Sequence, residues 1–83
     1  MLVDSPSLLI TDDDHDFRET LRDVFLPRGF RTLLASDGEE ALQILEDEPV
    51  HLLLVDMHMP RCSGLELIRR ARELRIALPW ILL

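Results

Sequence analysis

Short apolar runs alternate along the chain with segments whose apolar residues recur at helical spacing. The runs 7–11 and 50–55 are apolar almost throughout, which is typical of strands that are covered on both faces. The segments 30–35 and 80–83 are predicted as further strands. The chain therefore predicts four strands, with a helical segment between each strand and the next.

The first helical segment begins near Asp16 and is ended by Pro27 and Gly29, because the residue before a proline is driven out of the helical region. Either Asp14 or Asp16 can cap its first turn. The apolar stripe, spaced i, i+4, i+7 and i+8, consists of Phe17, Leu21, Val24 and Phe25.

Two capping boxes predict where the other helices begin. Asp37 is followed three residues later by Glu40, and Ser63 is followed by Glu66 at the same spacing. In each box the acidic residue is expected to reach back to the cap. The first of these helices ends before Pro49.

The order βαβαβαβ with short connections indicates an α/β fold, a doubly wound parallel sheet with helices on both faces. We interpret residues 1–83 as one domain, in which residues 1–6 form a short lead-in. Two of the strands end in carboxylates, with Asp12 and Asp13 after the first and Asp56 after the third. Ligands of such sheets bind beyond the carboxyl ends of the strands, so these residues are candidates for a site.

Composition narrows the range of partners. The net charge is −7, with 16 acidic residues against 9 basic ones, all of them arginine. This balance argues against direct binding to nucleic acid or to an anionic membrane surface. The single cysteine, Cys62, excludes an internal disulfide. The chain shows no leader peptide and no apolar run long enough to cross a bilayer, so we expect it to be cytoplasmic.

Two motifs of this chain, taken together, resemble the receiver domain of two-component response regulators. The first is Leu8-Leu9-Ile10-Thr11-Asp12-Asp13-Asp14, and the second is Val55-Asp56-Met57-His58-Met59-Pro60 with Gly64 four residues after the proline. The similarity covers residues 7–83. It implies the flavodoxin-like strand order 2-1-3-4, in which the first and third strands are neighbours.

That order would bring Asp12, Asp13 and Asp56 into one pocket, where repulsion between the carboxylates favours a bound cation, and oxygen ligands suit Mg²⁺. The resemblance implies that Asp56 is the phosphoacceptor, which takes a phosphoryl group from a phosphohistidine of a sensor histidine kinase. Asp13 would hold the metal directly and Asp12 would position it, with the backbone carbonyl of His58 as a further ligand. Pro60 and Gly64 would shape the loop. Such a domain is no separate enzyme, although it catalyses its own phosphorylation.

The sequence also departs from the family pattern. Receiver domains use a Ser or Thr after the fourth strand and a Lys after the fifth, and neither switch residue is present in this chain, which contains no lysine. The fifth strand and the last two helices are absent as well. A bare apolar strand at 80–83 would expose an edge that pairs with another chain, so a homodimer is possible.

Two alternatives remain open. The chain could be a truncated receiver that serves only as a dimerisation or interaction module. It could instead be a phosphatase similar to the haloacid dehalogenases, with Asp12 as nucleophile and Asp14 as general acid and base. Against the phosphatase, Asp16 replaces the expected Thr or Val, and the motif around Asp56 is left unexplained.

Other residues are expected to be structural. His15 and His58 are predicted to be exposed, and His51 to support a strand. Cys62 is predicted to lie exposed in a loop. Trp80 should be buried near the site if the fourth strand pairs normally. The core candidates among the aromatic residues are Phe17, Phe25 and Phe30.

Overall fold

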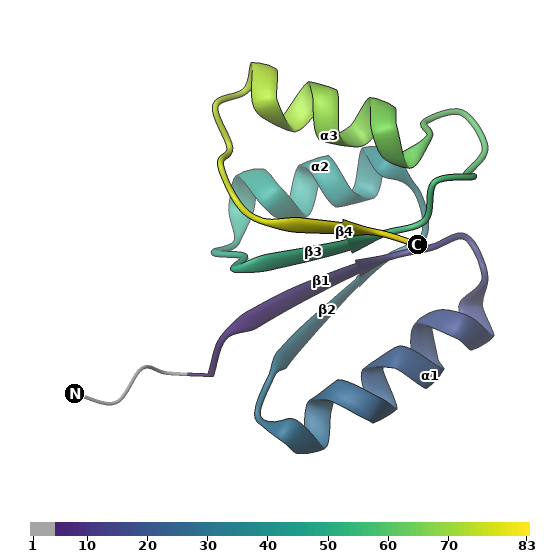
Figure 1. Cartoon of the computed structure of the whole chain (residues 1–83), viewed down its shortest axis with the longest axis vertical. Helices are drawn as coiled ribbons and strands as arrows, with labels where there is room; N and C mark the ends of the chain where they lie inside the picture. Colours follow the sequence, from purple (N-terminus) through teal and green to yellow (C-terminus); the bar gives the residue numbers. More distant parts are fainter. Residues whose placement is uncertain (1–4) are drawn as a thin grey trace.

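Two helices cover one face of a four-stranded sheet and one helix covers the other face in the computed structural model (Figure 1). The structure describes residues 5–83, so most of the predicted lead-in lies outside the described residues. In chain order the elements are β1 (Ser7–Thr11), α1 (His15–Phe25), a 3₁₀ helix (Leu26–Arg28), β2 (Arg31–Ala35), α2 (Gly38–Asp47), β3 (Leu52–Val55), α3 (Gly64–Glu73) and β4 (Trp80–Leu82).

All four strands are parallel, and their order is β2-β1-β3-β4. This confirms the predicted order. Thr11, at the end of β1, lies opposite Ala35 of β2 and Val55 of β3. The chain segments that follow β1 and β3 therefore leave the sheet side by side, which places the two acidic motifs next to each other.

The two faces of β1 serve different parts of the core. Leu9 packs into the larger cluster, beneath α2 and α3, whereas Leu8 and Ile10 pack on the α1 side. All five residues of β1 are buried. This explains the uninterrupted apolar run, because a strand with helices on both faces has no side that water reaches.

The first helix is less buried than its apolar stripe predicts. None of its residues is buried, and Phe17, predicted as core, is 40% exposed. Phe25 and Phe30 are partly buried and meet edge to face, with ring centroids 5.6 Å apart. The difference arises because α1 alone covers its face of the sheet, so only the inner edge of the stripe finds neighbours.

Side-chain caps begin all three α-helices. The Asp14 carboxylate accepts hydrogen bonds from the amides of Asp16 and Phe17, which settles the choice left open for α1. Asp37 and Ser63 cap the other two helices as predicted. The expected reach back of the acidic partners was wrong in detail: Glu40 accepts from the amide of Ser36, and Glu66 bonds Arg69 instead.

Trp80 departs from its predicted burial although β4 pairs with β3 in the expected way. It opens β4 at the end of the sheet opposite the acidic residues and is 45% exposed. In the part of the chain that the structure describes, β4 forms an edge of the sheet, so Trp80 has a neighbouring strand on one side only. None of the helices in residues 5–83 combines the length and the apolar character that crossing a bilayer requires.

Candidate functional site

Three carboxylates converge beyond the ends of β1 and β3. Oxygens of Asp12, Asp13 and Asp56 all lie within 4.8 Å of one another. The sheet itself sets this geometry, because the amide of Asp56 donates to the carbonyl of Thr11 over 2.9 Å and the amide of Asp12 donates to that of Ala35 over 3.1 Å. The positions of Asp12 and Asp56 are therefore set by the hydrogen bonds of the strand ladder.

The three carboxylates differ in exposure. Asp12 is only 6% exposed, Asp56 is half-buried and Asp13 is exposed. Burial raises the pKa of Asp12, and the nearby charges of Asp56 and Asp13 raise it further. A hydrogen bond from the amide of Asp14 lowers the pKa, but the net shift is upward. The protein alone therefore stabilises the negative charge of Asp12 poorly. A cation at this position would offset the burial of that charge and its repulsion by the other two carboxylates.

The loop between β1 and α1 is tied at both ends. One oxygen of Asp12 accepts from the amide of Asp14 over 2.9 Å. The guanidinium of Arg18, one turn into α1, donates to the carbonyl of Asp12 over 2.7 Å. Asp14 is occupied as the helix cap and is not part of the cluster of three carboxylates. This arrangement does not favour the phosphatase interpretation, which needs Asp14 free for proton transfer.

Asp56 follows the last residue of β3, and its side chain is half-buried. Its Oδ1 accepts from the amide of His58 over 3.0 Å, which fixes the rotation of the carboxylate. The His58 side chain is exposed, as is that of His15, in agreement with the predicted exposure of both. That the carbonyl of His58 is a metal ligand remains a prediction. His51 supports the start of the sheet by accepting from the amide of Ser7.

Gly64 allows α3 to begin against the backbone of Asp56. A Cβ at this position would lie 2.5 Å from the carbonyl oxygen of Asp56, and the Gly64 amide donates to Met57 over 3.1 Å. Pro60 stands in the exposed loop between them, where its carbonyl accepts from the amide of Cys62 over 2.7 Å. The two residues thus have contacts that fit the predicted shaping of the loop.

Cys62 is buried, contrary to the predicted exposure. Its sulfur packs against Gly38, where α2 begins, and no side chain larger than hydrogen fits at that contact. The loop around Asp56 folds back over the sheet, so that Met59 and Cys62 join the larger core cluster. The predicted exposure was wrong because loop position alone does not show which side chains turn inward.

Sequence reasoning also missed two residues beside the acidic cluster. Arg18 was overlooked because its contact is to a backbone carbonyl, which leaves no mark in residue types or spacing. The hydroxyl of Thr11 is buried, and no hydrogen-bond partner for it lies within residues 5–83. A threonine among aliphatic residues at the end of a buried strand was the available signal.

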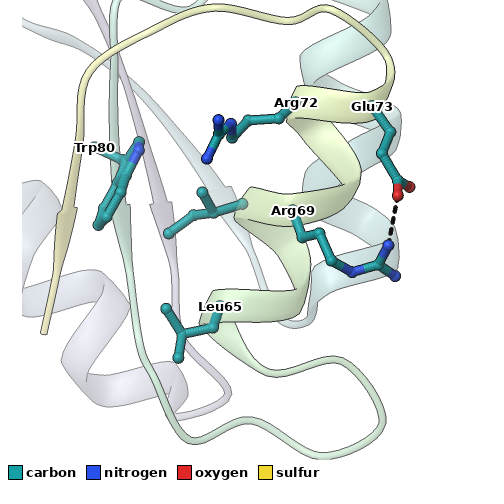
Figure 2. Close-up of a pocket in the computed structure, with 6 residues that line it drawn as sticks. Leu65, Arg69, Arg72, Glu73 and Trp80 are labelled. Carbon is teal, nitrogen blue, oxygen red and sulfur yellow. Dashed lines mark hydrogen bonds and ion pairs between the residues drawn. The ribbon is translucent and has the colours of Figure 1, made fainter.

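A groove lies apart from this site, between α3 and β4. It encloses about 520 Å³ and is lined by Leu65, Ile68, Arg69, Arg72, Glu73 and Trp80. Figure 2 shows Arg72 extending from α3 toward Trp80, while Arg69 turns away to pair with Glu73. This groove thus combines apolar and charged side chains, and its lining does not include the three carboxylates.

The acidic cluster fits a magnesium ion by the chemistry of its donors. It offers three carboxylates with ligand atoms close enough to share one ion, and no nitrogen or sulfur atom. Hard oxygen donors that leave coordination positions to water are the environment that Mg²⁺ favours. The raised pKa of Asp12 agrees with this, since the cluster lacks a compensating positive charge of its own.

Comparison with known proteins gives a consistent result. A family model described as the response regulator receiver domain matches residues 8–83. The chain is 38% identical over 79 residues to the response regulator MprA of Mycobacterium ulcerans, covering 95% of this chain and 34% of that protein. It is 33% identical over 67 residues to the response regulator RR06 of Streptococcus pneumoniae, covering 81% and 31%. The chain thus spans about a third of the length of these curated relatives.

Solved structures show the same similarity. A receiver domain of the Francisella response regulator 1452 superposes with a TM-score of 0.89 at 29% identity, over 94% of this chain and 64% of that one. The response regulator TrrA of Thermotoga maritima, solved in complex with Mg²⁺ and BeF, gives a TM-score of 0.86 at 31% identity, over 93% and 67%.

Proposed function

The chain belongs to the response regulator receiver domain family, and on that premise we propose that Asp56 is the residue that accepts the phosphoryl group. The observation that carries this proposal is the position of its carboxylate. Asp56 is half-buried at the end of β3, held in one rotation by the amide of His58, and faces Asp12 and Asp13 within 4.8 Å. A nucleophilic carboxylate needs such a fixed and accessible oxygen.

Asp12 and Asp13 are proposed to hold Mg²⁺ together with Asp56, and the carbonyl of His58 to complete the protein ligands. When bound, the ion supplies positive charge that screens the repulsion between the carboxylate and the incoming phosphoryl group. The chain's own residues orient the reaction. The strand ladder fixes the separation of Asp12 and Asp56, and the His58 amide holds one Asp56 oxygen, which leaves the other oxygen free to attack.

The proposed donor is the phosphohistidine of a sensor histidine kinase, and the domain promotes the transfer to its own side chain. We place this activity in the cytoplasm, where such a donor and Mg²⁺ are available. The net charge of −7 makes the domain itself a poor binder of nucleic acid or of an anionic membrane.

Phosphorylation by a small-molecule donor tests the assignment. After incubation with acetyl phosphate and Mg²⁺, intact-mass spectrometry should show one adduct of about 80 Da, and peptide mapping should place it on Asp56. Asp56→Asn should abolish it. Asp14→Asn is the matched control, since it removes a neighbouring carboxylate, keeps a good helix cap and should leave the adduct unchanged. An adduct on Asp12, or none at all, would contradict the proposal.

A second copy of the chain is the proposed partner of the surface around β4. In residues 5–83 no strand pairs with the outer edge of β4, and Trp80, Ile81 and Leu83 are each close to half exposed. Such an edge is a template for pairing. Arg72 makes no ion pair within the described residues, and an acidic second copy would supply carboxylates to it.

Sedimentation at increasing micromolar concentrations tests this partner. The wild type should shift from monomer to dimer, and Ile81→Lys should remain a monomer because it places a charge on the paired edge. Leu26→Lys, equally exposed but distant on the 3₁₀ helix, should dimerise like the wild type. A wild-type monomer throughout this range would show that the second copy is not the partner.

A further inference from the structure

Arg18 makes an unusual contact for a surface arginine. Its side chain is half-buried, forms no ion pair in the part of the chain that the structure describes, and donates from Nη1 to the carbonyl oxygen of Asp12 over 2.7 Å. Carboxylates are plentiful nearby on α1, as in the Glu19–Arg22 pair. The guanidinium of Arg18 nevertheless engages the backbone at the end of β1.

This contact completes the bonding of the Asp12 backbone. The Asp12 amide is held by Ala35, its side chain by the amide of Asp14, and its carbonyl by Arg18. The carbonyl belongs to the peptide group that joins Asp12 to Asp13, and a peptide group is planar. Fixing the carbonyl therefore fixes the direction in which the chain enters Asp13.

Asp13 is restrained less directly than the other two carboxylates. It is exposed, and within residues 5–83 its carboxylate accepts no hydrogen bond from a backbone amide or a basic side chain. Asp12 and Asp56, in contrast, are both anchored through the sheet. Of the three carboxylates, Asp13 depends most on the geometry of the loop that carries it.

We propose that Arg18 is a positioning residue for the metal site, which clamps the Asp12–Asp13 peptide so that the Asp13 carboxylate faces Asp12 and Asp56. The inference rests on the proposed magnesium site. It concerns the backbone, because the guanidinium of Arg18 donates to the carbonyl oxygen of Asp12 and pairs with no carboxylate within residues 5–83.

The clamp and a simple charge effect predict opposite results. Removing a positive charge near an anionic pocket should strengthen cation binding if charge is all that matters. Removing the clamp should weaken Mg²⁺ binding, because part of the binding free energy is then used to order the Asp13 carboxylate. Loss of an outer-shell partner typically weakens metal binding by on the order of tenfold or more.

Magnesium titration of ¹⁵N-labelled protein separates the two. The amide shifts of Asp13 and Asp56 report the dissociation constant for the wild type, Arg18→Met, Arg18→Lys and Arg22→Met. Arg18→Met should bind about tenfold more weakly, and Arg18→Lys, which keeps a donor, should lose less. Arg22→Met is the matched control, because it makes the same charge change on the same helix, whereas the Arg22 side chain pairs with Glu19. This variant should bind Mg²⁺ as the wild type does or slightly more tightly.

The metal-free protein gives a second readout. The order parameter of the Asp13 amide should fall in Arg18→Met and stay unchanged in Arg22→Met, which a general loss of stability would not produce at this one loop. If Arg18→Met binds Mg²⁺ as tightly as the wild type or more tightly, the clamp is refuted while the metal site stands. If Arg18→Met does not fold, the same comparison is made on Arg18→Lys. A wild type that shows no magnesium-dependent shifts at Asp13 and Asp56 overturns the metal site, and the clamp with it.

Discussion

Asp12 carries a charge in a place where water hardly reaches. Its pKa is raised chiefly by burial, so the folded protein holds this proton more tightly than the unfolded chain does. The stability that comes from the protonated carboxyl is therefore complete below the ordinary aspartate pKa of 3.8 and is lost as pH rises through the raised value. At neutral pH the buried charge weakens the metal-free fold.

Asp12→Asn should consequently stabilise the metal-free protein at pH 7, because it removes the buried charge and keeps an oxygen for the amide of Asp14. A gain of about 1 kcal/mol would raise the melting temperature by roughly 4–8 °C in a domain of this size. Thermal melts over a pH series measure it. The gain should vanish in acid, and saturating Mg²⁺ should favour the wild type. A variant less stable than the wild type at pH 7 without metal would contradict this account.

Two buried hydroxyls on β1 offer a paired comparison. Thr11 Oγ1 has no partner within residues 5–83, whereas Ser7 Oγ accepts from Arg31 over 3.3 Å. Thr11→Val removes an unsatisfied polar group at constant shape and should raise the free energy of unfolding by about 1 kcal/mol. Ser7→Ala should lower it by a similar amount. Urea titrations of both variants measure the difference, and a destabilised Thr11→Val would reveal a partner for its hydroxyl.

At the scale of elements, the start of α3 packs closely against the backbone that follows β3. Gly64→Ala would place a Cβ against the backbone of Asp56, which cannot yield as a side chain can. We expect a loss of about 1–3 kcal/mol together with weaker Mg²⁺ binding, since the Asp56 loop must move. Denaturant titration and magnesium titration measure the two effects.

Gly29→Ala is the control for that substitution. Gly29 has φ of 94° and open space around it, so alanine there is strained by its backbone alone. It should lose stability yet keep the wild-type affinity for Mg²⁺, because the 3₁₀ helix is remote from the carboxylates. Equal metal affinity in Gly64→Ala and the wild type would show that the contact does not govern the site.

The elements themselves were predictable because their signals are local. Proline, capping side chains and apolar spacing placed every α-helix and strand, but not the 3₁₀ helix Leu26–Arg28. The strand starts are shifted, since β2 begins at Arg31 and β3 at Leu52. The resemblance supplied the strand order and thus the meeting of Asp12 with Asp56. What could not be predicted depends on neighbours from distant parts of the chain, as with Phe17, Cys62 and Trp80, or on a side chain that contacts backbone, as with Arg18.

At the scale of the whole molecule, the metal site links folding to ion concentration. The carboxylates meet only when β1 and β3 are paired, so Mg²⁺ should bind the folded chain and not the unfolded one. At tenfold excess over its dissociation constant it should add about 1.4 kcal/mol to the free energy of unfolding. Melts over a magnesium series measure this, and Asp13→Asn should respond far less. An equal response in Asp13→Asn would indicate binding elsewhere.

The burial of the central strand also affects hydrogen exchange of its amides. Leu8, Leu9 and Ile10 have no exposed surface, and β1 is paired on both sides. Deuterium can therefore reach the amides of this strand only when the sheet comes apart as a whole, while those of the loop around His58 can exchange through small local openings. The exchange of the β1 amides thus reports the free energy of complete unfolding, and its slowing by Mg²⁺ would measure how much a bound ion stabilises the folded chain.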